Sequence, residues 1–403
     1  MFDNEFPPLG GGTGVVNYYL LQEMARSQDV TVDLVTSARS GTAYETERFA
    51  DRITIYKVPV DNRNIHHASN LELLRYSWRG LRMARRLLKQ HRYDVSFAFA
   101  GVPAGALSYV LSLTHGLPYV LSLQGPDVPG FEARYNYLYP VLTPLIKKIW
   151  RRASAVTAIS AEQVLLAHRT MPDLPLVTIP NGVETELFAP ASDEAKRPFT
   201  IICVARLIER KGQHHLLRAL AQLRVNCTQP VRLIVVGTGD AEAQLRELAD
   251  SLQVADAVTF KGFVSREQMP SLYREADVFA LPSQQEGMSI ALLEAMASGL
   301  PVIVTDTGGT AELVTQGQNG EIVPWSDVHA LTRALRNLLN AENLRRQMGA
   351  ESRRRALQFG WPVLATRYIE LCERVMLPSA ASQRAISRLR VDVRGDLHKE
   401  PRT

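Results

Sequence analysis

Cysteine is scarce in this sequence: Cys203, Cys227 and Cys372 are spread over 403 residues. The three are far apart, odd in number and not in the spacing of metal ligands. This excludes a disulfide framework and a cysteine-rich zinc site. The sequence also opens without the basic segment and apolar run of a secretory signal. Together these absences predict a cytoplasmic protein.

Long apolar runs are also missing, apart from one stretch without a formally charged side chain at 102–124. That stretch is about as long as a membrane-spanning helix. However, Gly116-Leu117-Pro118 interrupts it, because glycine and proline break a helix. The sequence therefore predicts a buried helix at 103–115 followed by a buried strand at 118–123, and no membrane span.

The chain has no strong excess of charge of one sign. Its net charge of +5 is small for this length, and it has no zinc-finger spacing, aromatic-basic RNA motif or heptad repeat. Nucleic acid is therefore not expected as a partner. The 46% apolar and 22% charged residues are ordinary for a folded protein. A length of 403 residues exceeds what one core usually holds, which predicts two domains.

Short apolar runs alternate with amphipathic stretches of helical period along the chain. In the first half the predicted strands are 30–36, 53–59, 95–100, 119–123, 155–159 and 176–180. In the second half they are 200–205, 232–236, 258–261, 278–281 and 302–305. Continuous Val, Ile and Leu runs are typical of strands buried in a parallel sheet. The pattern predicts an α/β fold with two doubly wound, Rossmann-like domains.

A polar, proline-flanked segment, APASDEAKRP at 189–198, separates the two halves. It places an N-terminal domain at 1–190 and a C-terminal domain at 199–358. A helix at 361–376 is expected to pack back on the N-terminal domain, and 379–403 to form a flexible tail. Almost no strand precedes the first glycine-rich loop. We therefore expect the first strand to be truncated and the true start to lie upstream of Met1.

That glycine-rich loop is Gly10-Gly11-Gly12-Thr13-Gly14, directly before a helix. Glycines let a backbone approach a phosphate or sugar closely, and a helix N-terminus supplies unpaired N–H groups. The spacing differs from the dinucleotide fingerprint, so a simple tight turn remains the alternative.

A second motif, Arg206-Leu207-Ile208-Glu209-Arg210-Lys211-Gly212, follows a predicted strand. Ligands bind at the carboxyl ends of strands in doubly wound sheets, and two cations there can neutralise a diphosphate. An ordinary basic loop is the alternative.

The third motif, EGMSIALLE, places Glu286 in a loop, starts a helix near Ser289, and places Glu294 on that helix about two turns away from Glu286. Carboxylates can accept paired hydrogen bonds from sugar hydroxyls. Glu294 lies in an otherwise apolar helix, where a charge is costly without a partner. The N–H groups of 287–289 are expected to face an anion. The alternative for Glu294 is a side chain that simply reaches solvent.

In this order the motifs resemble the retaining GT-B glycosyltransferases known as family 4. The resemblance covers nearly the whole chain. It includes the opening segment EFPP with the glycine loop, then PNGV at 180–183, VGTG at 236–239, GFV at 262–264, ASGLPV at 297–302 and GG at 308–309 followed by Glu312.

The resemblance implies a GT-B fold whose two domains face a central cleft, with the acceptor on the N-terminal domain and the nucleotide sugar on the C-terminal one. The donor would be a UDP- or GDP-linked hexose, transferred with retention to a glycan or glycolipid of surface polysaccharide or glycolipid synthesis. No metal is expected, because Arg206 and Lys211 would stabilise the diphosphate. Two alternatives stay open: a nucleotide-sugar epimerase of the same architecture, and a binding protein with weakened catalysis.

The resemblance also implies roles for individual residues. Catalytic roles go to Glu286, Arg206, Lys211 and Asp127. Donor binding is assigned to Glu294, Gly287, Met288, Ser289, Gly11 and Gly12. The acceptor side is assigned to Gln124, Asp127 and Asn181. Gln124 stands where many relatives have a histidine, and an amide cannot act as a base. The proton-transfer residue therefore stays unassigned, and a turn role for Asp127 remains open.

Two basic helices are predicted at 74–92 and 137–152. The first has arginines at helical spacing and an opposing apolar face of Leu74, Trp78, Leu81 and Leu88. Basic faces with nearby tryptophan and tyrosine can dock on anionic lipid headgroups, so peripheral association with the inner membrane face is one expectation. A solvated face on a packed helix is the other.

Overall fold

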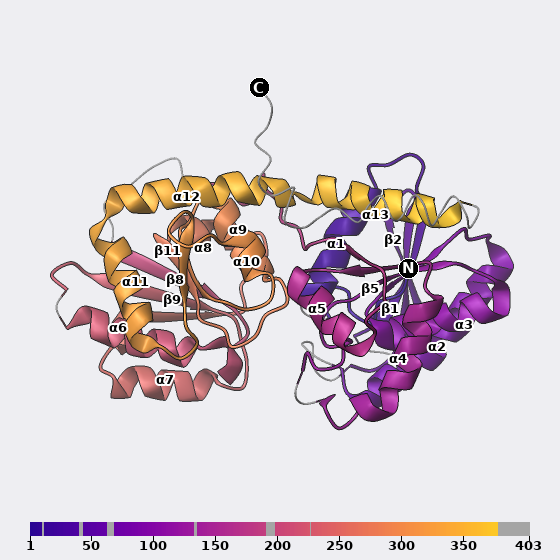
Figure 1. Cartoon of the computed structure of the whole chain (residues 1–403), viewed down its shortest axis with the longest axis horizontal. Coiled ribbons are helices and arrows are strands. Elements are labelled where there is room, and N and C mark those ends of the chain that lie inside the picture. Colours follow the sequence, from indigo (N-terminus) through magenta and orange to yellow (C-terminus); the bar gives the residue numbers. More distant parts are fainter. Residues whose placement is uncertain are drawn as a thin grey trace. The chain divides into compact units, whose positions relative to one another are not determined.

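The computed structural model describes residues 1–9, 12–39, 43–62, 68–132, 135–190, 198–225 and 227–377. The chain forms two compact units: unit 1 contains Met1–Pro180 and the helix α13 (Trp361–Met376), and unit 2 contains Asn181–Gly360 (Figure 1). Gly10, Gly11, most of the expected linker and the expected tail lie outside the described residues.

Unit 1 ends at Pro180, whereas the sequence placed the end of the N-terminal domain at residue 190. The physical reason is a short parallel bridge between Val183 and Gly360, in which Val183 N–H donates to the Phe359 carbonyl at 2.9 Å. The segment after Pro180 is therefore anchored to unit 2 before the polar linker begins.

The sheet of unit 1 contains two groups of strands. The first, in the order β1-β3-β2, consists of β1 (Val32–Ala38), β2 (Glu45–Ala50) and β3 (Ile53–Pro59). The second, in the order β4-β5-β6-β7, consists of β4 (Ser96–Phe99), β5 (Tyr119–Ser122), β6 (Ala155–Ala158) and β7 (Leu176–Thr178). Phe2 joins them by parallel bridges to Val35 in β1 and Ala98 in β4. One bridging residue thus occupies the central position of the sheet.

Helices cover both faces of this sheet (Figure 1). They are α1 (Gly12–Met24), α2 (Asn70–Gln90), α3 (Ala106–His115), α4 (Tyr139–Arg152), α5 (Ala161–Thr170) and α13. A π-helical turn, Gly101–Gly105, leads into α3. The indole of Trp361 in α13 stacks on Tyr19 of α1 at 5.7 Å, and Tyr368 meets Phe97 of β4 edge-on at 5.4 Å. The last described helix is thus part of the core of unit 1.

Unit 2 contains one parallel six-stranded sheet in the order β10-β9-β8-β11-β12-β13. Its strands are β8 (Phe199–Val204), β9 (Val231–Val236), β10 (Val258–Gly262), β11 (Val278–Leu281), β12 (Val302–Thr305) and β13 (Gly320–Val323). Its α-helices are α6 (Gln213–Arg224), α7 (Glu242–Ser251), α8 (Met269–Arg274), α9 (Ile290–Ala297), α10 (Thr310–Leu313), α11 (Val328–Asn340) and α12 (Glu342–Ala356).

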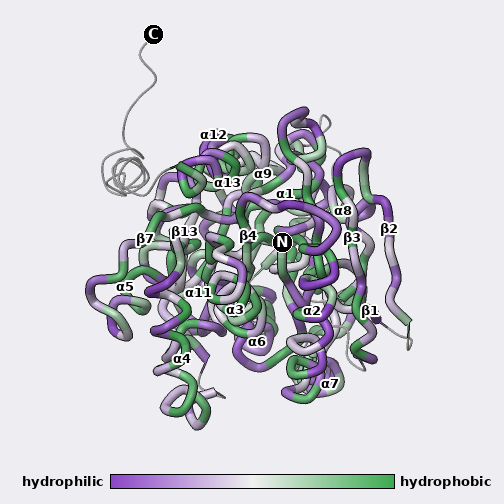
Figure 2. The backbone as a smooth tube through the Cα atoms, turned by 90° about the vertical axis from the view of Figure 1, so that its right-hand side faces the viewer, coloured by the Kyte–Doolittle hydropathy of each residue, from purple (hydrophilic) through white to green (hydrophobic). Residues whose placement is uncertain are grey.

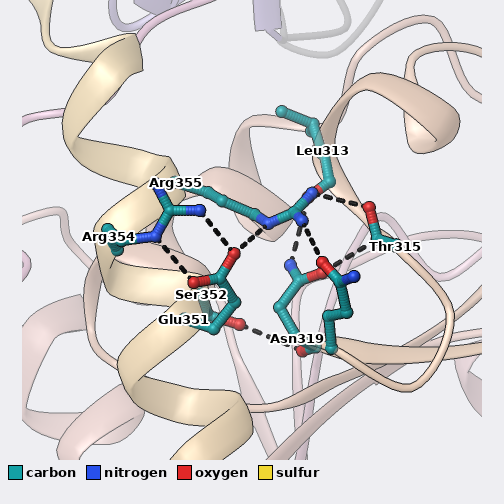
Figure 3. Close-up of polar contacts among 8 residues, drawn as sticks. Leu313, Thr315, Asn319, Glu351, Ser352, Arg354 and Arg355 are labelled. Atoms are coloured by element: carbon teal, nitrogen blue, oxygen red, sulfur yellow. Dashed lines mark hydrogen bonds and ion pairs between the residues drawn. The ribbon is translucent and has the colours of Figure 1, made fainter. Parts of the chain in front are cut away.

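A network of ion pairs and hydrogen bonds on α12 fixes the connection between α10 and β13 (Figure 3). Arg354 and Arg355 both bond Glu351 at 2.7 Å, and these bonds lower the pKa of Glu351 to about 2. Arg355 also donates to Thr315 Oγ1 at 2.7 Å, and Ser352 donates to the Asn319 carbonyl at 3.1 Å. The turn before the edge strand β13 is therefore held by side chains of a helix 30 to 40 residues away.

The prediction of two doubly wound α/β units is confirmed, and each strand predicted from an apolar run is present within two residues at either end. The prediction missed β2 and β13. Both lie at a sheet edge. β2 has few apolar residues and is coloured mostly as hydrophilic in Figure 2, whereas β13 is only four residues long. Residues 102–124 form α3 and the buried β5, and none of the described helices is long and apolar enough to cross a membrane.

Candidate active site

The site in unit 2 begins at the carboxyl end of β8. Arg206 follows that strand, and a 3₁₀ turn, Glu209–Lys211, leads to Gly212, which has a left-handed φ of 72°. A Cβ on Gly212 would collide with the Pro282 carbonyl oxygen. Only glycine therefore lets the turn carrying Lys211 lie directly against the loop after β11.

Lys211 and Glu286 form an ion pair across these neighbouring strand ends. Lys211 Nζ lies 2.5 Å from Glu286 Oε1, and each side chain is 14% exposed. Ser283 Oγ donates to the same oxygen at 2.7 Å. The predicted diphosphate cation and the predicted sugar carboxylate are thus in contact, and each offsets the cost of partly burying the other.

The backbone of Gly287, Met288 and Ser289 is held from three sides. Gly309 N–H donates to the Gly287 carbonyl at 2.5 Å, and Asn181 Nδ2 donates to the Met288 carbonyl at 3.0 Å. Ser289 is the N-cap of α9, since its side chain accepts from Leu292 N–H. The helix therefore starts where the sequence placed it, on a rigid loop at the end of β11.

The Asn181 contact lies within unit 2, on the loop predicted to bind the donor, although the sequence assigned this residue to the acceptor side. Gly308 and Gly309 lie against the same loop, and a Cβ on Gly308 would collide with the carbonyl oxygens of Glu286 and Gly287. Gly308-Gly309 was visible in the sequence, but nothing local showed that it packs on a loop 20 residues earlier.

Glu294 is buried in α9, as the predicted motif requires. Tyr273 Oη donates to Oε2 at 2.9 Å, and Arg266 Nη1 lies 3.4 Å from Oε1. Burial raises the pKa of Glu294 to about 7, while Arg266 and the Tyr273 hydrogen bond partly oppose that rise. The expectation that this glutamate needs a partner is correct, and its partners come from the loop before α8 and from α8 itself.

Arg266 links Glu294 to a second carboxylate. Its Nη2 lies 3.4 Å from Glu184 Oε2, and its guanidinium lies over the Phe188 ring at 5.4 Å. Tyr273 packs edge-on against the same ring at 5.7 Å. Arg266, Tyr273 and Glu184 were not predicted from the sequence as site residues. The one indication of them in the sequence was the charge of Glu294 in an apolar helix, which calls for a partner. That charge does not identify which residues of the chain supply the partner.

Asp127 in unit 1 is buried at the carboxyl end of β5. Its Oδ1 accepts from the N–H groups of Gln124 and Gly125, both at 2.9 Å, and its Oδ2 accepts from Gly101 N–H at 2.8 Å. Burial raises the pKa of Asp127, and these hydrogen bonds counteract part of the rise. Through these three hydrogen bonds from backbone N–H groups, Asp127 connects the loop after β5 to the turn after β4.

The remaining predicted residues of unit 1 lie near strand or helix ends. The Gln124 side chain donates from Nε2 to Ser122 Oγ at 2.8 Å. Gly12 is the exposed first residue of α1. Gly11 lies outside the described residues.

Within the described ranges, no three His, Cys, Asp or Glu side chains are grouped so that they could hold a metal ion.

Two protein-family models match this chain: Glycosyltransferase Family 4 over residues 10–187, and Glycosyl transferases group 1 over 184–355. A GDP-mannose-dependent alpha-(1-6)-phosphatidylinositol monomannoside mannosyltransferase of Mycolicibacterium smegmatis is 30% identical over 387 residues, covering 91% of this chain and 96% of the relative. This chain belongs to glycosyltransferase family 4. The resemblance inferred from the motifs is confirmed, and the protein is a glycosyltransferase.

Other comparisons agree with this family. A monoacylated phosphatidylinositol monomannoside mannosyltransferase of Corynebacterium glutamicum is 28% identical, covering 92% of this family 4 chain and 96% of the relative. Sucrose-phosphate synthase from Thermosynechococcus elongatus matches the fold with a TM-score of 0.78 at 22% identity, covering 90% of this chain and 93% of its own. Neither the epimerase nor the weakened binding protein finds support among these relatives.

Proposed function

We propose that this family 4 member is a retaining, metal-independent transferase that moves a hexose from a nucleoside diphosphate sugar to a lipid-linked acceptor. The Lys211–Glu286 pair carries the proposal, because it places a cation for the diphosphate next to a carboxylate for the sugar. GDP-mannose is the first donor to test, since the similar mannosyltransferases are named for it.

Each charged group has a role that its surroundings support. Arg206 and Lys211 stabilise the diphosphate, on which negative charge grows as the bond to the sugar breaks. Glu286 accepts from hydroxyls of the transferred hexose, and Glu294 accepts from the ribose hydroxyls. Because Tyr273 fixes one oxygen of Glu294, the carboxylate keeps one orientation before the nucleotide arrives. The N–H groups of the 287–289 loop, at the start of α9, face the phosphates.

Retention then follows from attack on the same face that the leaving group departs from. The bond from the anomeric carbon to the diphosphate oxygen breaks, and the bond to the acceptor oxygen forms. The acceptor hydroxyl gives its proton to the departing phosphate oxygen, so no protein base is needed. This route is compatible with Gln124, whose amide cannot accept the proton, and with an Asp127 carboxylate already shared among three N–H groups.

We further propose that unit 1 docks on an anionic membrane through α2 and α4, at the inner face of the membrane. Leu74 and Trp78 of α2 are 67% and 63% exposed, on the same side as the exposed Arg75 and Arg82. Val141 of α4 is 76% exposed, on a face that also carries Leu145 and Lys148. Apolar side chains can enter the headgroup region while the cations bind lipid phosphates.

This arrangement corrects the apolar face expected on α2. Leu81 and Leu88 pack against the core, whereas Leu74 and Trp78 point to solvent beside the arginines. The buried residues of α2 are Glu72, Tyr76, Gly80, Met83, Ala84 and Leu87. The helix therefore has its hydrophobic core contacts and still presents a second, exposed amphipathic surface.

Proton NMR of the sugar released by slow hydrolysis of GDP-mannose tests the proposed chemistry, with a metal chelator present throughout. The expected first product keeps the α configuration of the donor, and its rate is unchanged by the chelator. A β product would overturn retention, and loss of activity with the chelator would overturn metal independence. Faster hydrolysis of UDP-hexoses would overturn the choice of donor.

A further inference from the structure

An open pocket of about 370 Å³ lies at the carboxyl ends of β12 and β13 in unit 2. Its walls include Gln284, Asp306, Thr307, Ile322, Pro324 and Trp325. None of these residues was assigned a role by the motifs. The volume falls in the range of small-molecule sites, and an aromatic ring with a few polar groups is a usual lining for one.

Trp325 is held in place before any ligand arrives. A Cβ on Gly212 would meet its six-membered ring at 3.0 Å, and His215 packs edge-on against it with ring centres 4.8 Å apart. The turn that carries it closes through Asp327 N–H to the Pro324 carbonyl at 3.2 Å, and Asp327 caps α11. One part of the indole is therefore packed, and another part lines the pocket.

The residue after Trp325 has an uncommon backbone conformation. Ser326 has a φ of 62°, which is rare for a residue other than glycine, asparagine or aspartate. Such conformations cost free energy and cluster at binding sites, where they aim a neighbouring side chain. In this chain the uncommon conformation directly follows Trp325, whose half-buried indole lines the pocket.

The polar groups of the pocket suit hydroxyls. Asp306 and Gln284 have exposed side chains, and the Gln284 backbone is fixed by its N–H bond to the Arg210 carbonyl at 2.8 Å. A carboxylate accepts paired hydrogen bonds, and an amide both donates and accepts. A pyranose ring has an apolar face of C–H groups that can lie on an indole, with hydroxyls around its edge that can reach such partners.

The pocket adjoins the proposed hexose site. Thr305 and Thr307 line both this pocket and a smaller cavity of about 10 Å³ bordered by Glu286 and Ser289. That smaller cavity holds about one water and cannot take a sugar ring. The Trp325 pocket, by contrast, is a nearby space in unit 2 that is large enough for a second ring beside the transferred one.

We propose that Trp325, Asp306 and Gln284 form a subsite for a pyranose ring of the acceptor. The proposal rests on the proposed transferase function, since it takes the neighbouring Glu286 site as the position of the transferred hexose. Trp325 supplies the stacking surface, and Asp306 and Gln284 bind the hydroxyls at its edge. An acceptor that already carries a hexose would then be bound by unit 2 through that hexose, in addition to being anchored through its lipid.

Saturation-transfer NMR and titration with methyl α-D-mannopyranoside test this subsite in the full chain with GDP bound. Trp325→Ala should weaken pyranoside binding about tenfold or more, and Trp325→Phe should retain part of it. Asp306→Ala should weaken it severalfold without a folding risk, because this side chain is exposed. Leu165→Ala, which removes an exposed apolar side chain of α5, is the control and should leave pyranoside binding unchanged.

Glu286→Gln separates the two possible sugar positions. Pyranoside binding that survives Trp325→Ala but is lost in Glu286→Gln would place the sugar in the hexose site and overturn the proposal. Equal binding by the wild type and both Trp325 and Asp306 variants would also overturn it. GDP affinity of at least about half the wild-type value shows that each variant is folded. If pyranoside binds through Trp325 in a protein that hydrolyses no nucleotide sugar, the subsite stands and the proposed function fails.

Discussion

Lys211 Nζ lies 2.5 Å from Glu286 Oε1, although the two residues are 75 positions apart in the chain. They meet because Lys211 follows β8 and Glu286 follows β11, and these strands pair in parallel with Ile201 opposite Val278. The carboxyl ends of adjacent parallel strands lie at one edge of a sheet, which is where doubly wound folds bind ligands. Several expectations for activity depend on this contact and on the nearby Glu294.

Glu286→Gln should lower the transfer rate about 10²- to 10³-fold, because a charged group that acts on the reacting sugar is removed. Affinity for bare GDP should be unchanged or higher, since Lys211 loses its partner and is freer to bind the diphosphate. Turnover of the intact donor and calorimetric titration with GDP measure the two effects. Glu242→Gln, which breaks a more exposed ion pair on α7, is the control. Full activity of Glu286→Gln would remove this residue from the active site.

Glu294→Gln should weaken bare GDP binding about ten- to hundredfold, because hydrogen bonds to charged groups contribute roughly 1.5–3 kcal/mol. Tyr273→Phe should have a smaller effect, since it removes only the hydroxyl that orients the carboxylate. The same calorimetric titrations measure both. An equal loss of GDP affinity in Glu286→Gln and Glu294→Gln would contradict the division of roles between the glutamates.

GDP affinity should also depend on pH through Glu294, whose pKa burial raises to about 7. The ionised carboxylate accepts from both ribose hydroxyls, and its population rises about tenfold between pH 6 and pH 8. Affinity should therefore increase with pH over this window. GDP itself also loses a proton there, so Glu294→Gln is titrated in parallel as the reference. Identical pH profiles for the two proteins would show that Glu294 does not titrate on binding.

Asp127→Asn should lower the free energy of unfolding by about 1–3 kcal/mol, because the amide cannot accept from all three backbone N–H groups. GDP affinity should be unaffected, since Asp127 and its three hydrogen-bond partners all lie in unit 1. Urea unfolding of the variant measures this, with the exposed Asp173→Asn as the control. Wild-type stability combined with a lost transfer rate would indicate that Asp127 acts in catalysis and not in holding its loop.

Reversing Arg75, Arg82 and Arg85 to glutamate should weaken binding to vesicles that contain anionic phosphatidylinositol, while GDP-mannose hydrolysis in solution persists. These three side chains are exposed, whereas Arg79 bonds the Pro59 carbonyl and is left intact. Reversal of the exposed Arg218, Arg274 and Arg333 of unit 2 changes the net charge equally and serves as the control. Co-sedimentation with vesicles measures the effect. An equal loss of vesicle binding in both triple variants would show that binding depends on the net charge of the protein and not on this surface of α2.

Local patterns predicted much of this fold because they depend on few neighbouring residues. The run VFAL at 278–281, the loop after it and the start of α9 were all readable within about 20 positions. The edge strands β2 and β13 were not predicted, because β2 is largely polar and β13 is only four residues long. An edge strand is held by pairing to its neighbour and needs little apolar sequence of its own.

The sequence by itself determined the two α/β halves, the family, and the two glutamates of EGMSIALLE, which are separated by seven residues. Only the tertiary structure decided which groups those glutamates meet: Lys211 for Glu286, and Tyr273 with Arg266 for Glu294. It also decided that Asn181 holds the Met288 loop and that Trp78 faces solvent. The physical reason is that strand order and helix packing set these contacts. Both bring together residues tens of positions apart, at distances that no local period encodes.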